Sequence, residues 1–329
     1  MKNCLPKIDL HCHLDGSVRP ETILDLAKKE DIKLFSYDID DIKKALIAPF
    51  DCESLNEYLE RFKIPNDIMQ SKESLKRITF ELLEDAAKEN VKYIEIRFAP
   101  LLHTLKGLSV DEIIQSVTDG IKLGEEKYEI KGNLILSCMR NMGEDAAIKV
   151  IEEGKKFLGN YVVAIDLCGP EEKGFVHDFV KAIRLAREYG YRVTIHAGET
   201  GFGINVLDAV KLLGAERIGH GIFITNCDEA YKIVKEKGIT LETCPTSNVQ
   251  TKAVKSFDSH PFYDFYKDGI NVTINTDNRT VSNIDMTNEC NIAFEKFKIN
   301  NDDYKNIYLK TVEATFADED TKEWLKQFI

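Results

Sequence analysis

An α/β fold, closed as a (β/α)8 barrel, is predicted by three features of the 329-residue sequence. Eight short runs of β-branched and apolar residues recur along the chain, and longer segments with helical spacing of apolar residues separate them. Several short runs, such as Val162–Ile165, are apolar throughout, like strands that a parallel sheet buries on both faces. Regular alternation of such strands with helices is typical of a barrel surrounded by helices.

The predicted strands, in chain order, are Lys7–Leu14, Val91–Phe98, Asn133–Met139, Val162–Leu167, Arg192–His196, Arg217–Gly219, Thr240–Thr243 and Asn271–Asn275. The alternative is an open, doubly wound sheet. That fold normally has a glycine-rich phosphate turn after its first strand. Here the turn reads His11-Cys12-His13-Leu14-Asp15-Gly16, so we favour the closed barrel, as a single domain of residues 1–329.

Helices are predicted in the gaps between these strands. The clearest begins at Ser109, which forms a capping-box signature with Glu112, and apolar residues continue at helical spacing to Ile121. Later gaps contain the helical segments 175–189, 206–213 and 230–237.

A long insertion, residues 15–90, follows the first strand. Within it, Ser54 and Glu57 form another capping-box signature. Four apolar residues follow at the spacing of one helix face: Leu55, Tyr58, Leu59 and Phe62. This amphipathic helix either packs on the barrel or forms a lid, because insertions after barrel strands lie at the C-terminal face, where barrel enzymes have their sites.

Composition excludes some classes of partner. Asp plus Glu number 56 against 44 Lys plus Arg, giving a net charge of −12, which disfavours nucleic acid and anionic membranes. We find neither a secretory signal nor an apolar run near the roughly 20 residues that cross a bilayer. The eight cysteines are scattered and form no C-x-x-C pair. We therefore expect a cytoplasmic protein with free thiols.

Metal-ligand residue types gather at the predicted strand ends. His11 and His13 are two residues apart in a strand, so both side chains point to the same side. His196, His220 and Asp277 end three further strands, and all strand ends converge on one face of a barrel. This pattern predicts a metal site. Imidazoles with one carboxylate suit Zn²⁺, although Fe, Co and Ni also bind such sites.

Other polar residues near these strand ends have candidate roles. Strand four ends in Asp166-Leu167-Cys168, without the bridging Lys of a binuclear site, so one metal is favoured. Glu199, just beyond His196, is a candidate general acid. His220, if it is not a ligand, could act as a base or orient a hydroxide. Glu242 is expected to hydrogen-bond His220 and fix its tautomer, or else to lie elsewhere in the barrel.

The remaining histidines, His103, His177 and His260, show no such placement, and we expect them at the surface or in loops.

Five motifs, in order, span almost the whole chain: Leu10-His11-Cys12-His13-Leu14-Asp15-Gly16-Ser17-Val18-Arg19-Pro20, Thr194-Ile195-His196-Ala197-Gly198-Glu199, Gly219-His220-Gly221, Cys244-Pro245-Thr246-Ser247-Asn248 and Asn275-Thr276-Asp277. As a set they resemble the adenosine deaminase family. The resemblance implies a (β/α)8 barrel of the amidohydrolase superfamily with one zinc ion per chain. It also implies deamination of adenosine and 2′-deoxyadenosine in purine salvage.

The resemblance assigns roles residue by residue. His11, His13, His196 and Asp277 would bind zinc, and Glu199 would protonate purine N1. His220 would take the proton of the attacking water or hold the resulting hydroxide, to which Asp277 would also hydrogen-bond. His13 and Asp15 would lie at the substrate, with Asp15 on the ribose 5′-hydroxyl, and the Gly169 N–H would meet N3. The apolar gate of the family would be Leu55, Tyr58, Leu59 and Phe62.

One position departs from the family pattern. Asn278 stands where the family often has an Asp that faces purine N7, and a neutral amide can donate there without a shifted pKa. Alternatives are a deaminase of adenine or of a modified adenosine, and, in another class, a catalytically inactive purine-binding relative. Asp15 favours the ribonucleoside, because relatives acting on the alternatives tend to have Glu there. We expect a small-molecule nucleoside as partner and a monomer or weak homo-oligomer.

Overall fold

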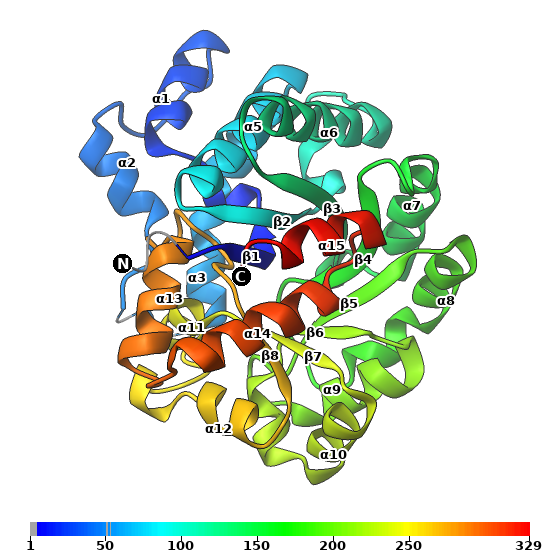
Figure 1. Cartoon of the computed structure of the whole chain (residues 1–329). Coiled ribbons are helices and arrows are strands. Elements are labelled where there is room, and N and C mark those ends of the chain that lie inside the picture. Colours follow the sequence, from blue (N-terminus) through cyan, green and yellow to red (C-terminus); the bar gives the residue numbers. More distant parts are fainter. Residues whose placement is uncertain (1–4, 51, 53) are drawn as a thin grey trace.

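The computed structural model describes residues 5–50, 52 and 54–329, and these form an eight-stranded barrel surrounded by helices (Figure 1). All strand pairs are parallel, and the strands follow one another around the sheet in chain order. The predicted barrel is confirmed. The strands are β1 Lys7–His13, β2 Val91–Phe98, β3 Lys131–Met139, β4 Val162–Cys168, β5 Arg192–Ala197, β6 Arg217–His220, β7 Thr240–Thr243 and β8 Asn271–Ile274.

Helices fill the connections and cover the outside of the barrel. The capping box predicted at Ser109 and Glu112 starts α6. Segment 206–213 differs slightly from prediction, because α9 continues there into a π-helical turn, Ala209–Leu213. The helices are α1 Pro20–Lys29, α2 Ile39–Leu46, α3 Leu55–Leu59, α4 Lys63–Ile68, α5 Lys72–Lys88, α6 Val110–Lys127, α7 Glu144–Gly154, α8 Val180–Tyr189, α9 Gly203–Asp208, α10 Asp228–Lys237, α11 Pro245–Gln250, α12 Phe262–Lys267, α13 Met286–Glu295, α14 Asn301–Ala314 and α15 Glu319–Lys326.

The barrel closes where the segment after β8 meets β1. The backbone N–H of Asp277 donates to the His11 carbonyl (2.8 Å), and the His13 N–H donates to the Asp277 carbonyl (2.7 Å). The Thr276 hydroxyl donates to the buried Asp9 carboxylate of β1 at 2.6 Å. Closure therefore fixes the two histidines of β1 beside Asp277.

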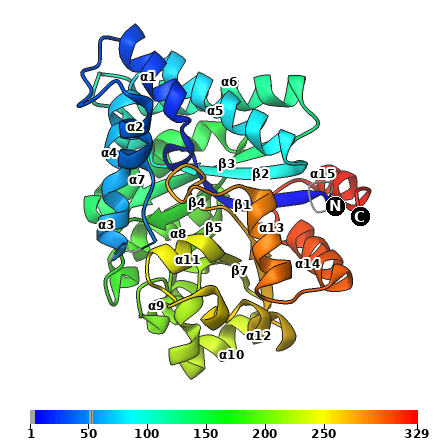
Figure 2. The ribbon, with the colours of Figure 1, turned by 90° about the vertical axis from the view of Figure 1, so that its left-hand side faces the viewer.

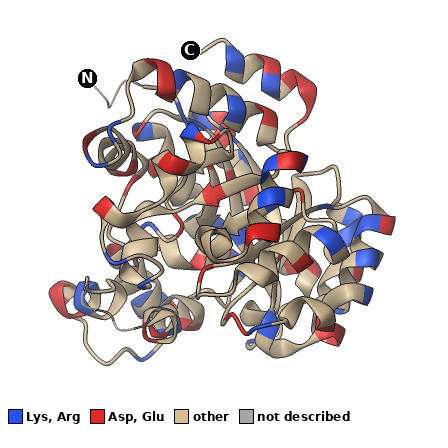
Figure 3. Cartoon of the chain, turned by 90° about the horizontal axis from the view of Figure 1, so that it is seen from below, with Lys and Arg blue, Asp and Glu red and all other residues tan. Residues whose placement is uncertain are grey.

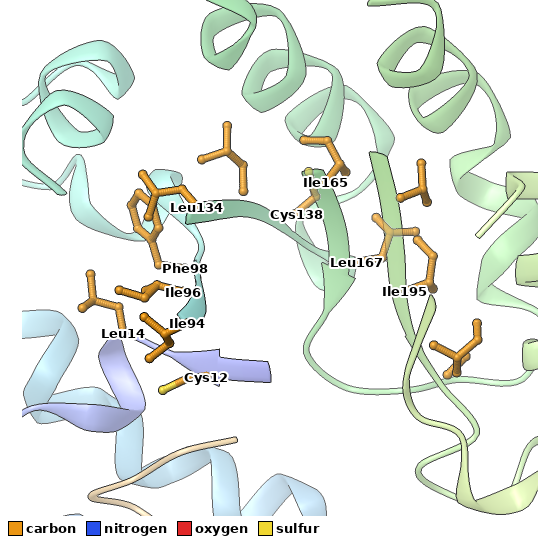
Figure 4. Packing of buried hydrophobic residues seen from close by; sticks show 14 of the residues in the cluster. Cys12, Leu14, Ile94, Ile96, Phe98, Leu134, Cys138, Ile165, Leu167 and Ile195 are labelled. Atoms are coloured by element: carbon orange, nitrogen blue, oxygen red, sulfur yellow. The ribbon is translucent and has the colours of Figure 1, made fainter. Parts of the chain in front are cut away.

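The largest apolar core lies between the strands and the outer helices (Figure 4). Cys12, Ile94, Ile96 and Leu167 belong to this layer, so Cys12 faces the helices while its neighbours His11 and His13 face the barrel interior. The alternation predicted for the first strand is confirmed at this residue. Packing on the outside holds β1 rigidly and so fixes the direction of both imidazoles.

The two ends of the barrel are covered differently (Figure 2). Helix α15 and the C-terminus lie at the end where the strands begin, and there Arg217 of β6 donates to the Ala314 carbonyl at the end of α14. The insertion that carries α1 to α4 lies at the opposite side in this view. The carboxyl ends of the strands, with their ligand residues, therefore open beneath the insertion.

The insertion differs from the single amphipathic helix that the sequence predicts. Ser54 does cap α3, since its hydroxyl accepts from the Glu57 N–H, but α3 ends at Leu59. A 3₁₀ turn, Glu60–Phe62, connects it to α4, which contains Pro65. Proline lacks the amide hydrogen that a longer regular helix would use, which favours a break in this segment.

Charges of both signs are interspersed on the outer helices (Figure 3). Within residues 5–50, 52 and 54–329, none of the helices combines the length and the apolar character that crossing a bilayer requires.

Candidate active site

Four of the predicted ligand residues converge at the carboxyl ends of the strands. Nε2 of His13 lies 3.2 Å from Nε2 of His196. Oδ1 of Asp277 lies 3.5 Å from Nε2 of His11 and 3.5 Å from Nε2 of His13. The side chains thus point their potential ligand atoms at one small volume, as the sequence predicts.

The opposite nitrogens of two of these imidazoles are held by buried carboxylates. Nδ1 of His11 lies 2.8 Å from Glu242, and Nδ1 of His196 lies 2.8 Å from Asp166. A carboxylate behind a histidine fixes the tautomer that leaves Nε2 unprotonated and makes it a better metal ligand. Glu242 therefore supports His11, and the predicted contact between Glu242 and His220 is wrong.

Two buried arginines hold these carboxylates in their charged form. Arg97 contacts Glu242 at 2.7 Å and Asp166 at 3.3 Å, while Nε of Arg217 donates to Glu242 at 2.7 Å. Burial alone would raise the pKa of Glu242, but the two guanidinium groups outweigh it and keep the pKa well below its ordinary value. The barrel interior is thus a network of paired charges on which the histidines rest.

The residues fit a bound metal ion. Nε2 of His11 is buried and makes no hydrogen bond within the described part of the chain, although it faces Asp277. A buried orphan nitrogen of this kind needs a partner, and a cation supplies one. Cys244 also lies within reach of His11 and Asp277, but its thiol donates to the Glu242 carbonyl, and burial raises its pKa well above the ordinary value. Three histidines and Asp277 are therefore the favoured donor set.

Gly219 provides room for the two central imidazoles. A Cβ at this position would lie 2.9 Å from Cε1 of His11 and 3.3 Å from the His196 Cα. Gly219 is therefore required for close packing of the ligand residues rather than for a special backbone angle.

Glu199 lies in the loop after β5, with its carboxylate 3.7 Å from Nε2 of His220. Burial and the nearby negative charges of Asp277 and Glu171 raise the pKa of Glu199 to about 8. The loop itself is held by Glu171, whose carboxylate accepts the N–H groups of Gly198 (2.7 Å) and Glu199 (2.9 Å). Glu199 is thus fixed in place as a carboxylic acid that carries a proton near neutral pH.

A cavity of about 420 Å³ opens beside these groups. Its walls include Asp15, Gly169 and Asn278, and the last two follow the ends of β4 and β8. Oδ1 of Asp15 and Oδ1 of Asn278 are buried and have no hydrogen-bond partner among the described residues. Burial raises the pKa of Asp15 to about 6. The cavity therefore offers unsatisfied polar groups in a mostly apolar enclosure, which is typical of small-molecule sites.

The insertion forms the outer wall of this cavity. All four predicted gate residues line it: Leu55, Tyr58, Leu59 and Phe62. Tyr58 is almost fully buried, and its hydroxyl lies 2.6 Å from the Ser282 hydroxyl in the segment after β8. This hydrogen bond therefore joins the cavity-lining part of the insertion to the segment after β8.

The other histidines only partly follow the prediction. His177 is exposed, whereas His103 and His260 are buried, so neither of these two lies at the surface. His260 does lie in a loop, as the second part of the prediction states, and His103 ends a 3₁₀ turn. His103 stacks on Phe98. His260 joins a hydrogen-bond chain that ends at His220.

Several residues of the site were not found from the sequence. The charged residues of buried strands, such as Arg97 and Asp166, carry a usable signal, because an apolar strand rarely contains an unpaired charge. Glu171 and Arg140 give no local signal. Arg140 donates to the His196 carbonyl at 2.9 Å and also to the Gly169 carbonyl, and both contacts bridge distant segments.

A closed eight-stranded parallel barrel with three histidines and one aspartate meeting at the strand ends defines the amidohydrolase class of enzymes. Residues 6–329 match the sequence model of the adenosine deaminase family. The chain belongs to this family.

Individual relatives agree with the assignment. The chain is 59% identical to an adenosine deaminase of Clostridium botulinum, over 99% of this chain and 98% of the relative. Among solved structures, an adenine deaminase from Arthrobacter aurescens has a TM-score of 0.91 at 25% identity and covers 98% of both chains. An N6-methyl-AMP deaminase from Arabidopsis thaliana has a TM-score of 0.87 at 28% identity, over 99% of this chain and 96% of that one.

A third solved structure, an amidohydrolase from Burkholderia ambifaria with bound Zn, has a TM-score of 0.88 at 26% identity, and covers 99% of this chain and 91% of that chain.

Proposed function

We propose that this protein catalyses the hydrolytic deamination of adenosine and 2′-deoxyadenosine, releasing ammonia and giving inosine and 2′-deoxyinosine for purine salvage. The observation that carries the proposal is the pairing of a proton-bearing Glu199 with the convergent histidine–aspartate set on one wall of a nucleoside-sized cavity. Close relatives named adenosine deaminase support the choice of substrate.

The metal in this proposal is a single Zn²⁺ held by His11, His13, His196 and Asp277. Its contribution when bound is to lower the pKa of a water molecule, so that hydroxide is available near neutral pH. The carboxylates of Glu242 and Asp166 hold the ligand imidazoles at the required angle. The zinc present in the amidohydrolase from Burkholderia ambifaria supports the choice of ion.

Glu199 acts as general acid at N1 of the purine. The amino group at C6 is a poor leaving group while the ring is aromatic, and a proton on N1 makes C6 electrophilic. A carboxyl group with a pKa of about 8 still holds its proton near neutral pH and can donate it. Asp277, beside Glu199 in the cavity wall, helps to keep that proton in place through its negative charge.

Recognition of the nucleoside uses the polar groups that line the cavity. Asp15 takes the ribose 5′-hydroxyl, the Gly169 N–H meets N3, and the Asn278 amide donates to N7. The orphan Oδ1 of Asp15 supports its role, because a ribose hydroxyl can donate to it, and the position of Asn278 on the cavity wall supports contact with the base. His13, partly exposed to the cavity, also borders the substrate.

The insertion acts as a lid. Leu55, Tyr58, Leu59 and Phe62 close over the nucleoside and exclude bulk water, which strengthens the electrostatic interactions inside the cavity. Their position on the cavity wall supports this role.

The test compares kcat/KM for adenosine, 2′-deoxyadenosine, adenine and N6-methyl-AMP on metal-loaded protein. We expect adenosine and 2′-deoxyadenosine to be preferred by at least about 100-fold. Adenine lacks the ribose that would meet Asp15, and N6-methyl-AMP would bring a negatively charged phosphate against the Asp15 carboxyl group. A preference for adenine or N6-methyl-AMP would replace the substrate assignment. Purine binding without turnover of any of the four would show an inactive relative.

A further inference from the structure

A line of three hydrogen bonds leads from a backbone amide to His220. The Phe262 N–H donates to Nδ1 of His260 at 3.1 Å, and Nε2 of His260 lies 3.1 Å from Oδ1 of Asn248. Nδ2 of Asn248 then lies 3.0 Å from Nδ1 of His220. All three side chains are buried, and they come from the end of β6, from α11 and from the residue two before α12.

The backbone amide fixes the polarity of the whole line. An amide N–H can only donate, so Nδ1 of His260 must accept and carries no proton. Burial lowers the pKa of His260 to about 3, so its ring is neutral and its proton is on Nε2. That Nε2–H donates to the side-chain oxygen of Asn248, which turns the amide nitrogen of Asn248 toward His220.

The same reasoning sets the tautomer of His220. The amide nitrogen of Asn248 can only donate, so Nδ1 of His220 accepts, and the neutral ring carries its proton on Nε2. Nε2 is the atom that faces Glu199 at the cavity wall. We propose that Asn248 and His260 are positioning residues that hold His220 as the Nε2–H tautomer, so that His220 presents a hydrogen-bond donor to the cavity.

This inference decides between the two roles considered for His220, and in that respect it rests on the proposed function. A ring that already carries a proton on Nε2 cannot take one there from the attacking water. It can donate to the hydroxide oxygen and orient it. His220 therefore acts by orienting the nucleophile, and the proton of the water passes instead to the carboxylate of Asp277, which lies beside His220 in the site.

The surroundings favour one fixed arrangement of the line. The Asn248 backbone N–H donates to the Cys244 carbonyl at 2.8 Å, and the Val254 N–H donates to the Asn248 carbonyl at 3.0 Å. The His260 ring packs against Phe297 with centroids 5.0 Å apart. These contacts fix the backbone of Asn248 and the ring of His260. The side-chain amide of Asn248 therefore keeps one orientation.

The tautomer can be measured directly by ¹⁵N NMR on protein labelled at histidine, both metal-free and zinc-loaded, with the His220 signals assigned from His220→Gln. We expect an unprotonated Nδ1 and a protonated Nε2 for His220 in both forms. A protonated Nδ1 with an unprotonated Nε2 would overturn the proposal. This readout does not depend on turnover, so it separates failure of the tautomer from failure of the proposed deaminase function.

Asn248→Asp reverses the polarity, because a carboxylate accepts from both histidines. We expect the proton of His220 to appear on Nδ1, and kcat to fall about 10- to 100-fold, the usual effect of losing a partner that orients a site residue, with KM changed far less. An unchanged tautomer and unchanged kcat in folded Asn248→Asp would overturn the role of Asn248.

Replacement of His260 gives a second test that does not depend on how Asn248→Asp folds. The amide nitrogen of His260→Gln can replace the Nε2–H donor and should preserve the His220 tautomer and kcat, whereas His260→Leu should lose both. Equal behaviour of the two variants would overturn the role of His260. The matched control is His103→Leu, which removes another buried imidazole and should leave the His220 signals unchanged.

Discussion

Residues of the candidate site divide into two groups by how their polar atoms are satisfied. Asp166, Glu171 and Glu242 are buried, and each accepts several hydrogen bonds. His11, Asp15 and Asn278 instead each keep one buried polar atom without a hydrogen-bond partner in the described residues. Because an unsatisfied buried polar atom costs free energy, a bound metal ion or nucleoside is the partner that we propose for this second group.

The substitution Glu199→Gln tests the proposed role of this single residue as general acid. Glutamine keeps the size of the side chain but cannot deliver a proton to N1, so kcat should fall by about 10²- to 10⁴-fold. Zinc content, measured by elemental analysis, should stay that of the wild type, since Glu199 is outside the proposed ligand set. Near-normal turnover in the variant would rule out the acid role.

At the scale of elements, strands position the candidate ligand residues and helices line the cavity beside them. The ligand residues lie at or just beyond the ends of β1, β5 and β8, where the packing of the outer core fixes them. The wall opposite them comes from α3 and the following 3₁₀ turn, joined to the barrel by Tyr58 and Ser282.

The hydrogen bond between Tyr58 and Ser282 should hold the proposed lid against the segment after β8. Tyr58→Phe and Ser282→Ala should each raise the Kd of inosine by roughly 2- to 10-fold, which corresponds to the net worth of one buried hydrogen bond. The double variant should bind inosine with the same Kd as either single variant, because the same hydrogen bond is lost in all three proteins. Tyr37→Phe, at a more exposed tyrosine away from the cavity, is the control. An unchanged Kd in both single variants would remove the lid role from this contact.

Helix α13 places a second unusual carboxyl group in the core. Glu289 is fully buried, accepts the Thr246 N–H at 3.2 Å, and burial raises its pKa from 4.5 to about 8. Between these two values the folded state keeps a proton that the unfolded state releases, so the stability of the fold falls as the pH rises through this window.

Glu289→Gln removes this titration. Urea unfolding should show the variant gaining at least about 1 kcal/mol relative to wild type as the pH rises across that window. A difference between the two proteins that stays constant with pH would contradict the raised pKa of Glu289.

The sequence predicts most of these elements but not their long-range contacts. Strand patterns and strand-end histidines are local signals, so the barrel and the positions of His11, His13, His196 and Asp277 follow from them. The partner of Glu242 cannot be predicted from the sequence. His11 and His220 both belong to strands near Glu242, and only the register of the barrel decides which of them it contacts. Asn248 lies in one of the five motifs but without an assigned role, and His260 lies in none, since the role of both depends on a polarity set by one backbone amide.

At the scale of the whole molecule, the barrel brings residues that are far apart in the sequence together in one site. The ligand residues span positions 11 to 277, and they meet only when β8 closes on β1. The buried arginines at its centre pair with carboxylates from several strands, and these paired charges support the proposed ligand residues. A site of this kind cannot form from any one segment, and metal binding should therefore depend on the complete fold.

The most direct measurement is a titration of chelator-treated protein with Zn²⁺, following the conversion of adenosine to inosine and the bound zinc in the same samples. We expect no turnover before addition, full turnover at one zinc per chain, and neither tight zinc binding nor turnover in His196→Ala. Full turnover by the metal-free protein, or none after one equivalent of zinc has bound, would contradict a deaminase built on these four ligands.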